Sequence, residues 1–340
     1  MGETNPPGLD LRRLSAHLEA ERPGLVRGDL TAALIAGGRS NLTYDVTDGH
    51  RRWVVRRPPL GHVLPTAHDM SREHRVITAL AGTDVPVPPT VLLCRDTEVI
   101  GAPFYVMDYV EGTPYRKAAQ LARIGPRRTH EVALSMVDTL VALHAVDPAS
   151  VGLGDFGRPE GFMERQLRRW SRQLDASRSR DLPGIDELHD RLTATRPVSP
   201  APTIVHGDYR LDNLLVDGGD RIAAVLDWEM STLGDPLTDL ALILMYSSSS
   251  MPVGSGVSDA HTAEGYPSAE EITARYAERS GRDVSSLDFY VGFAFFKLAV
   301  ILEGIHYRFR QGQTVGEDFD RIGEAVPRLI EGGLNRLAGD

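Results

Sequence analysis

One short stretch in the middle of the chain limits what the protein can be. Between residues 203 and 229, short apolar runs alternate with acidic and amide residues. Such runs, bounded by turn residues, predict short strands, and Asp-Gly-Gly-Asp predicts a tight turn between the last two of them. Asp208, Asn213 and Asp227 stand where these strands begin or end. The three predicted strands cover 203–205, 214–216 and 222–226.

These three polar side chains form a set with a particular chemistry. Asn213 follows Asp208 at a spacing of five residues, and Asp227 comes after the next apolar run. A carboxylate that accepts a hydroxyl proton, an amide oxygen and a second carboxylate can hold Mg²⁺ beside a nucleotide and orient an attacking hydroxyl. Each piece alone is usually a turn or a helix cap, so the combination carries the signal.

Composition excludes several classes of protein. The 340 residues carry a net charge of −10, which does not favour a nucleic-acid or anionic-membrane partner. Cys94 is the only cysteine, so we expect no internal disulfide and no thiolate metal cluster. The first residues lack the pattern of an export signal or a lipid anchor. We therefore expect a cytoplasmic protein, whose oligomeric state the sequence does not indicate.

The periodicity of apolar residues predicts an α+β fold with two lobes. A small antiparallel sheet with one main helix is expected in residues 1–108, and a larger, mostly helical lobe in 109–340. Residues 289–302 are the most apolar window, and Lys297 interrupts it, so we predict a buried core helix there. The other strands are expected at 30–36, 42–47, 51–57, 90–94 and 104–109. The helices are expected at 9–19, 68–81, 129–146, 161–177, 235–246, 268–280, 287–310 and 316–337.

The motifs resemble those of a known family. His206-Gly-Asp-Tyr-Arg-Leu-Asp-Asn213, Val225-Leu-Asp-Trp-Glu229 and Gly234-Asp-Pro-Leu-Thr-Asp-Leu240 are similar to the aminoglycoside phosphotransferase and choline kinase-like family. Within it, the chain resembles the branch of kinase-like domains that some organisms fuse to acyl-CoA dehydrogenases. The resemblance extends from about Gly37 to the C-terminal helices. It implies a protein-kinase-like fold that uses ATP and Mg²⁺.

The resemblance also assigns roles in the larger lobe. Asp208 would be the catalytic base, Asn213 and Asp227 the Mg²⁺ ligands, and Arg210 an electrostatic partner of the transferred phosphoryl group. A plain salt bridge from Arg210 to Asp212 is the alternative for that arginine. In related folds an aspartate placed like Asp239 holds the backbone of the catalytic loop. Because Asp239 lies in an apolar helix, it must find donors, while Asp235 suits the cap before Pro236.

The small lobe is expected to bind the nucleotide. The turn at Gly37-Gly-Arg-Ser-Asn would place Gly38, Ser40 and Asn41 over the phosphates. The lysine that usually clamps the phosphates is missing, because the chain has only Lys117 and Lys297. Arg56 stands at the matching place on a strand, with Val54 on the same face as the roof of the adenine site. Glu73 falls within the apolar face of the next helix, and we predict that it pairs with Arg56. An ordinary pair with Arg72, Arg75 or a backbone donor is the alternative.

The segment 104–112 is predicted to connect the lobes. As a hinge, the Asp108 carbonyl and the Val110 N–H could pair with adenine while Met107 packs behind the ring. An edge strand followed by a linker is the simpler alternative. The atoms that pair are not determined by the sequence.

The basic face of one predicted helix bears on the identity of the acceptor. In the predicted helix 161–177, Met163, Leu167, Trp170 and Leu174 form an apolar stripe, opposite Arg165, Arg168, Arg169 and Arg172. A solvated basic face is the plain reading, and an anion site for a CoA-bearing substrate is the alternative. We expect a small-molecule hydroxyl acceptor, such as a 4-hydroxyacyl-CoA-like metabolite. The other hypotheses are an aminoglycoside acceptor, a catalytically silent nucleotide-binding module, and a metal-dependent phosphohydrolase.

Overall fold

A computed structural model of the chain describes residues 5–35, 41–61, 68–248, 258–312 and 322–339. The chain divides into two compact units, each with its own core. The first is Met1–Gly112 together with Ala223–Glu229, and the second is Thr113–Ile222 together with Met230–Asp340. Along the chain the first unit extends to Gly112, and the segment that carries Asp227 belongs to it. Its backbone is attached there, because the Val225 N–H donates to the Pro86 carbonyl at 2.8 Å.

The first unit is built on one antiparallel sheet with the strand order β1-β2-β3-β5-β4. The meander predicted for the first three strands is confirmed, with Ala33 opposite Asp45 and Val55 opposite Tyr44. The third strand also pairs with β5, where Val54 lies opposite Met107. The strands are β1 (Thr31–Leu34), β2 (Leu42–Thr47), β3 (Arg52–Arg57), β4 (Thr90–Cys94) and β5 (Phe104–Asp108). The helices are α1 (Leu11–Glu21), α2 (Met70–Leu80) and α3 (Thr97–Ile100).

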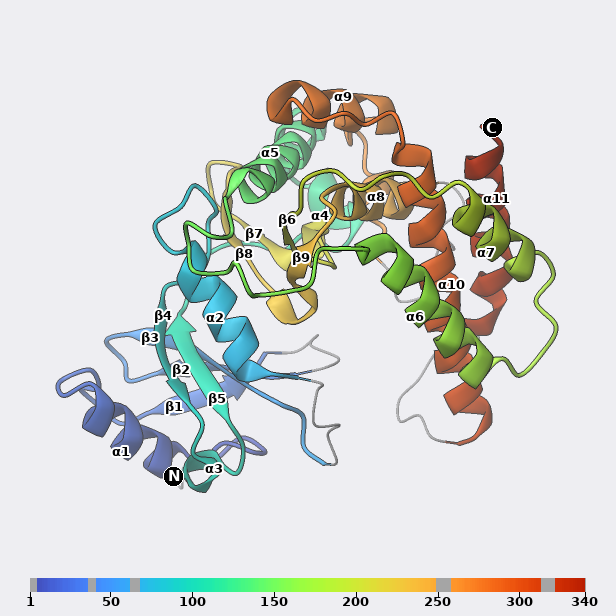
Figure 1. Cartoon of the computed structure of the whole chain (residues 1–340). Coiled ribbons are helices and arrows are strands. Elements are labelled where there is room, and N and C mark those ends of the chain that lie inside the picture. Colours follow the sequence, from blue (N-terminus) through green and yellow to red (C-terminus); the bar gives the residue numbers. More distant parts are fainter. Residues whose placement is uncertain (1–4, 36–40, 62–67, 249–257, 313–321, 340) are drawn as a thin grey trace. The chain divides into compact units, whose positions relative to one another are not determined.

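The two faces of this sheet have different roles. On one face Tyr44, Trp53 and Val55 join a hydrophobic cluster with Leu14 and Leu18 of α1. Alternation along β3 sends Val54 and Arg56 to the opposite face. There α2 covers the sheet, so that α1 and α2 lie on opposite sides of it (Figure 1). A polar group on the α2 side is therefore enclosed between a strand and a helix.

The second unit is mostly helical, as predicted. Its strands β6 and β9 pair with each other. Strand β7 pairs with β8 in the hairpin expected at Asp-Gly-Gly-Asp, although residues 223–225 of β8 are counted with the first unit. The strands are β6 (Thr203–Val205), β7 (Leu214–Val216), β8 (Ile222–Val225) and β9 (Thr232–Gly234). The helices are α4 (Ala118–Ala122), α5 (Pro126–Ala145), α6 (Phe162–Ser177), α7 (Ile185–Ala194), α8 (Leu237–Tyr246), α9 (Ala269–Ser280), α10 (Leu287–Arg310) and α11 (Val326–Ala338). Short 3-10 turns occur at Leu211–Asn213, Trp228–Met230, Ala260–Thr262 and Ile322–Ala325.

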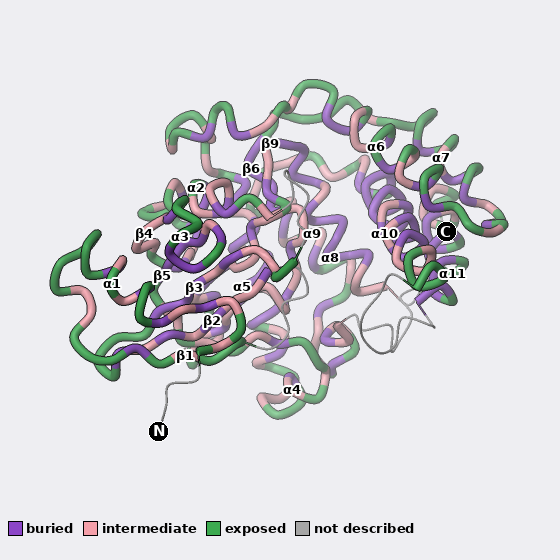
Figure 2. Tube along the Cα trace, turned by 90° about the horizontal axis from the view of Figure 1, so that it is seen from below, coloured by how far each residue is buried: buried purple, intermediate pink, exposed green. Residues whose placement is uncertain are grey.

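Helix α10 is the core helix of the second unit. It spans Leu287–Arg310, as predicted, and packs against α6, α7, α8 and α11. Within the described ranges it alone has the length and apolarity to cross a membrane, but 78% of that apolar window is buried inside the protein. Figure 2 shows its buried residues between α6, α7 and α11. Its apolar character is thus used for packing, which confirms the predicted core helix.

Several elements differ from the prediction. The α5 helix begins at Pro126 and not at Thr129, because proline suits the first helical position. The predicted helix 316–337 is α11, which starts at Val326 after a 3-10 turn at 322–325, while 316–321 lie outside the described residues. Strand β9 and helices α3, α4 and α7 were not predicted. β9 has three residues and α3 and α4 have four and five, too few for a periodic signal.

Candidate active site

The catalytic loop of the second unit begins where β6 ends. His206, Gly207 and Asp208 follow the strand, and a 3-10 turn at Leu211–Asn213 leads into β7. Gly207 has φ +84°, and a Cβ there would lie 2.7 Å from the Met230 carbonyl oxygen. Only glycine accepts this conformation and this close approach without strain. Steric constraints therefore explain why the middle residue of His-Gly-Asp is glycine.

A buried carboxylate anchors the loop. Asp239 of α8 is fully buried and accepts the His206 N–H at 2.6 Å and the Gly207 N–H at 2.8 Å. His144 Nε2 lies 3.3 Å from it, and His144 Nδ1 lies 2.7 Å from the Tyr276 hydroxyl. Burial alone would raise the pKa of Asp239, but the bonds from His144 and the Gly207 N–H hold it below its ordinary value. The predicted anchoring role of Asp239 is confirmed.

Asp235 contacts the start of α8, but it is not the cap residue that we predicted. Its carboxylate accepts the Leu237 N–H at 3.1 Å and the Tyr290 hydroxyl at 2.5 Å. Pro236 stands at the cap position and α8 begins at Leu237, so the cap lies one residue later than predicted. Burial raises the pKa of Asp235, although these donors oppose the shift. The aspartate thus binds the first turn of α8 from just outside the helix.

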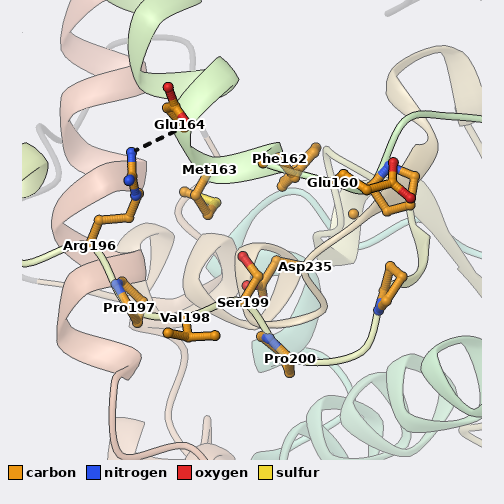
Figure 3. A pocket seen from close by; sticks show the side chains of 14 residues that line it. Glu160, Phe162, Met163, Glu164, Arg196, Pro197, Val198, Ser199, Pro200 and Asp235 are labelled. Carbon is orange, nitrogen blue, oxygen red and sulfur yellow. Dashed lines mark ion pairs between the residues drawn. The ribbon is translucent and has the colours of Figure 1, made fainter.

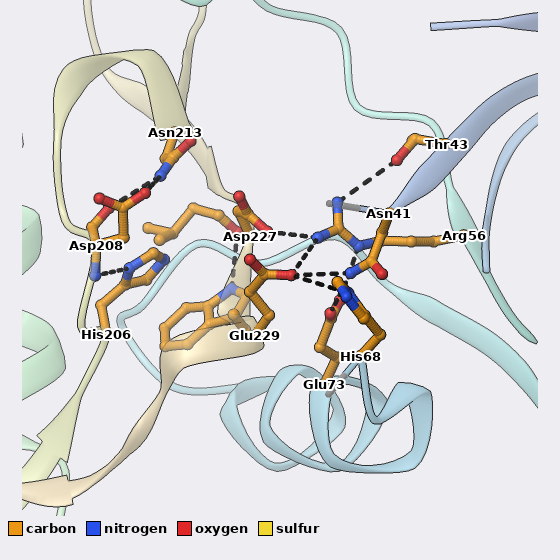
Figure 4. Close-up of polar contacts among 12 residues, drawn as sticks. Asn41, Thr43, Arg56, His68, Glu73, His206, Asp208, Asn213, Asp227 and Glu229 are labelled. Carbon is orange, nitrogen blue, oxygen red and sulfur yellow. Dashed lines mark hydrogen bonds and ion pairs between the residues drawn. The ribbon is translucent and has the colours of Figure 1, made fainter. Parts of the chain in front are cut away.

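Asp208 and Asn213 lie together in the loop. Asn213 Nδ2 donates to the Asp208 backbone carbonyl and to Asp208 Oδ2, both at 2.9 Å (Figure 4). No described residue donates to Asn213 Oδ1, which leaves that oxygen available for a cation. The Asp208 side chain is 31% exposed, so a reactant can reach it. This is the arrangement expected of a proton acceptor beside an amide ligand.

Arg210 contacts both of the partners considered for it. Its Nη2 lies 3.2 Å from Asp212 Oδ2, and its Nε lies 3.6 Å from Asp208 Oδ1. Burial raises the pKa of Asp212, and the charge of Arg210 opposes that rise. The salt bridge to Asp212 is therefore present, and the guanidinium is also close to the predicted base.

The first unit has a polar cluster of its own, between β3 and α2. Arg56 Nε lies 2.8 Å from Glu73 Oε2, so the predicted pair is confirmed. The Tyr105 hydroxyl donates to the same carboxylate at 2.9 Å, and Asn41 Nδ2 donates to Oε1 at 3.0 Å. Glu73 is 1% exposed. Burial raises the pKa of Glu73, while the charge of Arg56 and the Tyr105 hydroxyl oppose the rise.

Asp227 and Glu229 complete this cluster (Figure 4). Arg56 Nη2 forms an ion pair with Asp227 Oδ1, and Glu229 Oε2 lies 3.9 Å from the same nitrogen. Asn41 Nδ2 also donates to Glu229 at 3.0 Å. Asp227 has φ +66°, a strained value for a residue other than glycine and typical of functional sites. Sequence reasoning assigned no role to Glu229, although its position two residues after Asp227 was a usable signal.

The remaining nucleotide-site predictions fall on the sheet and the hinge. Val54 and Met107 are paired and buried on the Arg56 face. Asp108 ends β5, and its N–H donates to the Pro89 carbonyl at 2.8 Å. Within the described part of the chain, the Val110 N–H has no acceptor, which leaves it free for a ligand. Gly38 and Ser40 lie outside the described residues.

The predicted Mg²⁺ ligands are the amide oxygen of Asn213 and the carboxylate of Asp227. No group of three or more His, Cys, Asp or Glu side chains among the described residues is arranged to hold a metal ion. Carboxylate and amide oxygens of Asp227 and Asn213 are nevertheless the donors that Mg²⁺ prefers. Because Asp227 belongs to the first unit and Asn213 to the second, their joint Mg²⁺ site stays a prediction.

Comparison with known proteins decides the family. The model of the phosphotransferase enzyme family matches residues 31–272. The chain belongs to this phosphotransferase family. A crystal structure from Ralstonia eutropha, named as a putative aminoglycoside phosphotransferase, is 33% identical and has a TM-score of 0.85, with 97% of this chain and 98% of that chain covered. These matches confirm the fold class and the family resemblance.

More distant members of the family share the fold. The aminoglycoside phosphotransferase APH(4)-Ia, in a ternary complex with AMP-PNP and hygromycin B, has a TM-score of 0.60 at 15% identity, with 93% of this chain and 97% of that chain covered. At this identity the likeness concerns the fold alone. The protein-kinase-like fold is common to both.

Curated relatives of the phosphotransferase are longer proteins. Acyl-CoA dehydrogenase family member 11 of Rattus norvegicus is 36% identical over 335 residues, which are 96% of this chain and 43% of the rat protein. Acyl-CoA dehydrogenase family member 10 of Mus musculus is 36% identical over 299 residues, 86% of this chain and 28% of the mouse protein. The chain thus spans less than half the length of these relatives, which fit the branch that the motifs resemble.

Proposed function

We propose that this phosphotransferase moves the γ-phosphoryl group of ATP to a hydroxyl of a small molecule. The observation that carries the proposal is the second unit's loop, in which buried Asp239 anchors the backbone and Asn213 bonds to a partly exposed Asp208. A nucleotide-binding module has no need for a proton acceptor held in this way. The family supports phosphoryl transfer as the reaction class.

In the proposed reaction Asp208 is the general base. As the acceptor oxygen attacks the γ-phosphorus, the Asp208 carboxylate takes the hydroxyl proton. The new oxygen–phosphorus bond forms while the bond from the γ-phosphorus to the bridging oxygen breaks, and ADP leaves with that oxygen. Arg210, 3.6 Å from Asp208, would stabilise the negative charge of the transferred group.

The first unit would hold the nucleotide. Arg56 takes the place of the usual lysine, and its planar fork can bind a phosphate with two hydrogen bonds. Glu73 supports Arg56 from α2. Mg²⁺ bound by Asn213 and Asp227 would neutralise charge on the β- and γ-phosphates. Two family members whose fold is similar were solved with AMP-PNP or GDP, which supports a nucleotide of this kind.

For the acceptor we propose a hydroxyacyl-CoA-like metabolite. The longer relatives are named as acyl-CoA dehydrogenase family members. A hydroxylated acyl thioester belongs to the same class of compound as the substrates that this name indicates. On α6, Arg165 donates to two backbone carbonyls and Arg168 to Glu164 at 2.8 Å, so the basic face is partly engaged locally. We further propose a cytoplasmic location, without nucleic-acid or membrane partners.

An aminoglycoside acceptor is the second candidate, because the Ralstonia protein carries that name. A single experiment separates the candidates. The protein is incubated with MgATP and a panel of hydroxyacyl-CoAs and amino sugars, and phosphorylated products are followed by mass spectrometry. Transfer to hydroxyacyl-CoAs alone supports our proposal, and transfer to amino sugars alone replaces its acceptor. Nucleotide binding without transfer to any acceptor would favour the silent module, and phosphate release without an acceptor would favour the phosphohydrolase.

A further inference from the structure

Lys297 is a cation in an unusual place. It lies near the middle of α10, the core helix of the second unit, and is partly buried. Its Nζ donates to the Gly207 carbonyl at 3.3 Å, so it reaches the residue before the proposed base. No described carboxylate forms an ion pair with it. An ammonium has three donors, and the described residues accept from only one of them.

Such an arrangement is costly unless something uses it. A partly buried cation loses some of its hydration, and without a paired charge or a full set of acceptors that loss is only partly offset. Burial lowers the pKa of Lys297, although the charges of Asp208 and Asp239 oppose the shift. A helix core does not need a lysine to hold one carbonyl at 3.3 Å, because an apolar residue would pack there at lower cost. Apart from the Gly207 carbonyl, no described residue accepts from this ammonium, and because the side chain is only partly buried, the ammonium can donate to a ligand.

The surroundings of Lys297 are cationic and aromatic. The Trp170 ring of α6 lies with its centroid 5.7 Å from Lys297 Nζ and 5.4 Å from the Arg169 guanidinium carbon. Trp170 is 4% exposed, and its indole N–H has no hydrogen-bond partner. Both cations are within about 6 Å of the ring centroid, the range in which the face of an aromatic ring attracts a cation. We call Lys297, Trp170 and Arg169 the lysine subsite.

We propose that the lysine subsite binds a carbonyl or carboxylate oxygen of the acceptor, so that Lys297 is a specificity-determining residue for acyl acceptors. This inference rests on the proposed function and narrows it. The ammonium would donate to that oxygen while the acceptor's hydroxyl lies at Asp208. The same positive charge repels a polycationic amino sugar, so the subsite selects a neutral or anionic acyl compound.

Kinetics with a matched control test the proposal. Lys297→Met is compared with Lys297→Arg and with Lys117→Met, because exposed Lys117 is the only other lysine. The acceptors are 4-hydroxybutyryl-CoA, free 4-hydroxybutyrate and kanamycin. We expect Lys297→Met to raise KM for the preferred acyl acceptor about 10- to 100-fold, the range for losing a hydrogen bond from a charged donor. Lys297→Arg should recover part of the loss, and Lys117→Met should match the wild type.

The comparison between acceptors separates this role from a structural one. In Lys297→Met the preference for the acyl acceptor over kanamycin, measured as the ratio of kcat/KM values, should fall at least about 10-fold. If Lys297→Met raises KM for 4-hydroxybutyryl-CoA only, the bound oxygen is the thioester carbonyl. If it raises KM for free 4-hydroxybutyrate, the bound oxygen is the carboxylate. An equal loss with every acceptor and in acceptor-free ATP hydrolysis would assign Lys297 to holding the loop, and the proposal would be overturned.

A binding measurement decides the point even if no acceptor is turned over. The chain has three tryptophans, Trp53, Trp170 and Trp228, so ¹⁵N labelling gives three indole N–H signals, and Trp170→Phe assigns one. Titration with 4-hydroxybutyryl-CoA or 4-hydroxybutyrate, without nucleotide, should shift the Trp170 signal in the wild type but not in Lys297→Met. An unmoved Trp170 signal at saturating concentrations of both compounds would overturn the subsite. Failure of phosphoryl transfer alongside a shifted signal would instead overturn the proposed function.

Discussion

Replacing Asp239 by asparagine should destabilise the second unit through a loop that lies far from it in sequence. Its carboxylate accepts two backbone N–H groups of the catalytic loop, from His206 and Gly207, and contacts His144. Asparagine keeps one acceptor oxygen but turns an NH₂ group toward the other donor. One buried donor is then unsatisfied, which costs about 1–3 kcal/mol, and the remaining bond loses charge assistance worth about 1 kcal/mol.

The expected loss is therefore about 3 kcal/mol. For a domain of about 150–250 residues, 1 kcal/mol shifts Tm by about 2–4 °C, so Asp239→Asn should lower the melting temperature by about 6–12 °C. Differential scanning calorimetry measures it. The lowered pKa of Asp239 means that its stabilisation is present above the ordinary carboxyl pKa and is lost as the pH falls through the lower folded value. The Asp239→Asn protein has no carboxyl group to protonate at this position, so its melting temperature should fall less than that of the wild type as the pH is lowered.

A surface aspartate provides the control. Asp138 accepts two hydrogen bonds from Arg275, at 2.8 and 2.7 Å, but its side chain is 36% exposed. Exposed pairs contribute about 0.2–1 kcal/mol, so Asp138→Asn should change Tm by less than about 4 °C. If Asp239→Asn melts together with Asp138→Asn, the carboxylate does not anchor the loop and the argument from burial is wrong.

Two further substitutions test the two units separately. Gly207→Ala places a Cβ 2.7 Å from the Met230 carbonyl oxygen at φ +84°. We expect this variant to lose most of its transfer activity, while ADP binding, measured by calorimetry, stays near that of the wild type. Wild-type turnover would refute the steric argument. Arg56→Ala leaves the buried Glu73 carboxylate without its cation. We expect the free energy of unfolding of the first unit, measured by urea titration, to fall by about 3–5 kcal/mol, and ADP binding to weaken. Glu73→Gln combined with Arg56→Ala should recover part of the stability, and an Arg56→Ala protein with wild-type stability would contradict the pairing.

Local patterns in the sequence predicted the catalytic loop. Asp208 and Asn213 are five residues apart, and one turn of chain brings them together, so their contact follows from spacing alone. The same holds for the partnership of Arg56 and Glu73, because strand alternation and helix periodicity fix the faces on which they lie. In these cases the fold had little freedom to rearrange the residues.

Contacts between distant segments could not be predicted in the same way. Lys297 is 90 residues from Gly207, and in the sequence it is only a charge that interrupts an apolar run. Asn41 donates hydrogen bonds both to Glu73 and to Glu229, and Glu229 is 188 residues away from Asn41 in the sequence. The pairing of β6 with β9 joins three-residue strands whose register no periodicity reveals. Such contacts depend on how helices and strands pack against one another, and the local patterns of a single sequence do not contain that information.

The central claim is that Asp208 takes a proton during phosphoryl transfer. The direct measurement compares wild type with Asp208→Asn in the presence of MgATP and an acceptor that the wild type uses, with transfer followed by mass spectrometry and nucleotide binding by calorimetry. Asparagine has nearly the same shape but is not a base, so we predict that transfer falls by about 10²–10⁴-fold while MgATP affinity is retained. Equal turnover in the two proteins would contradict the mechanism.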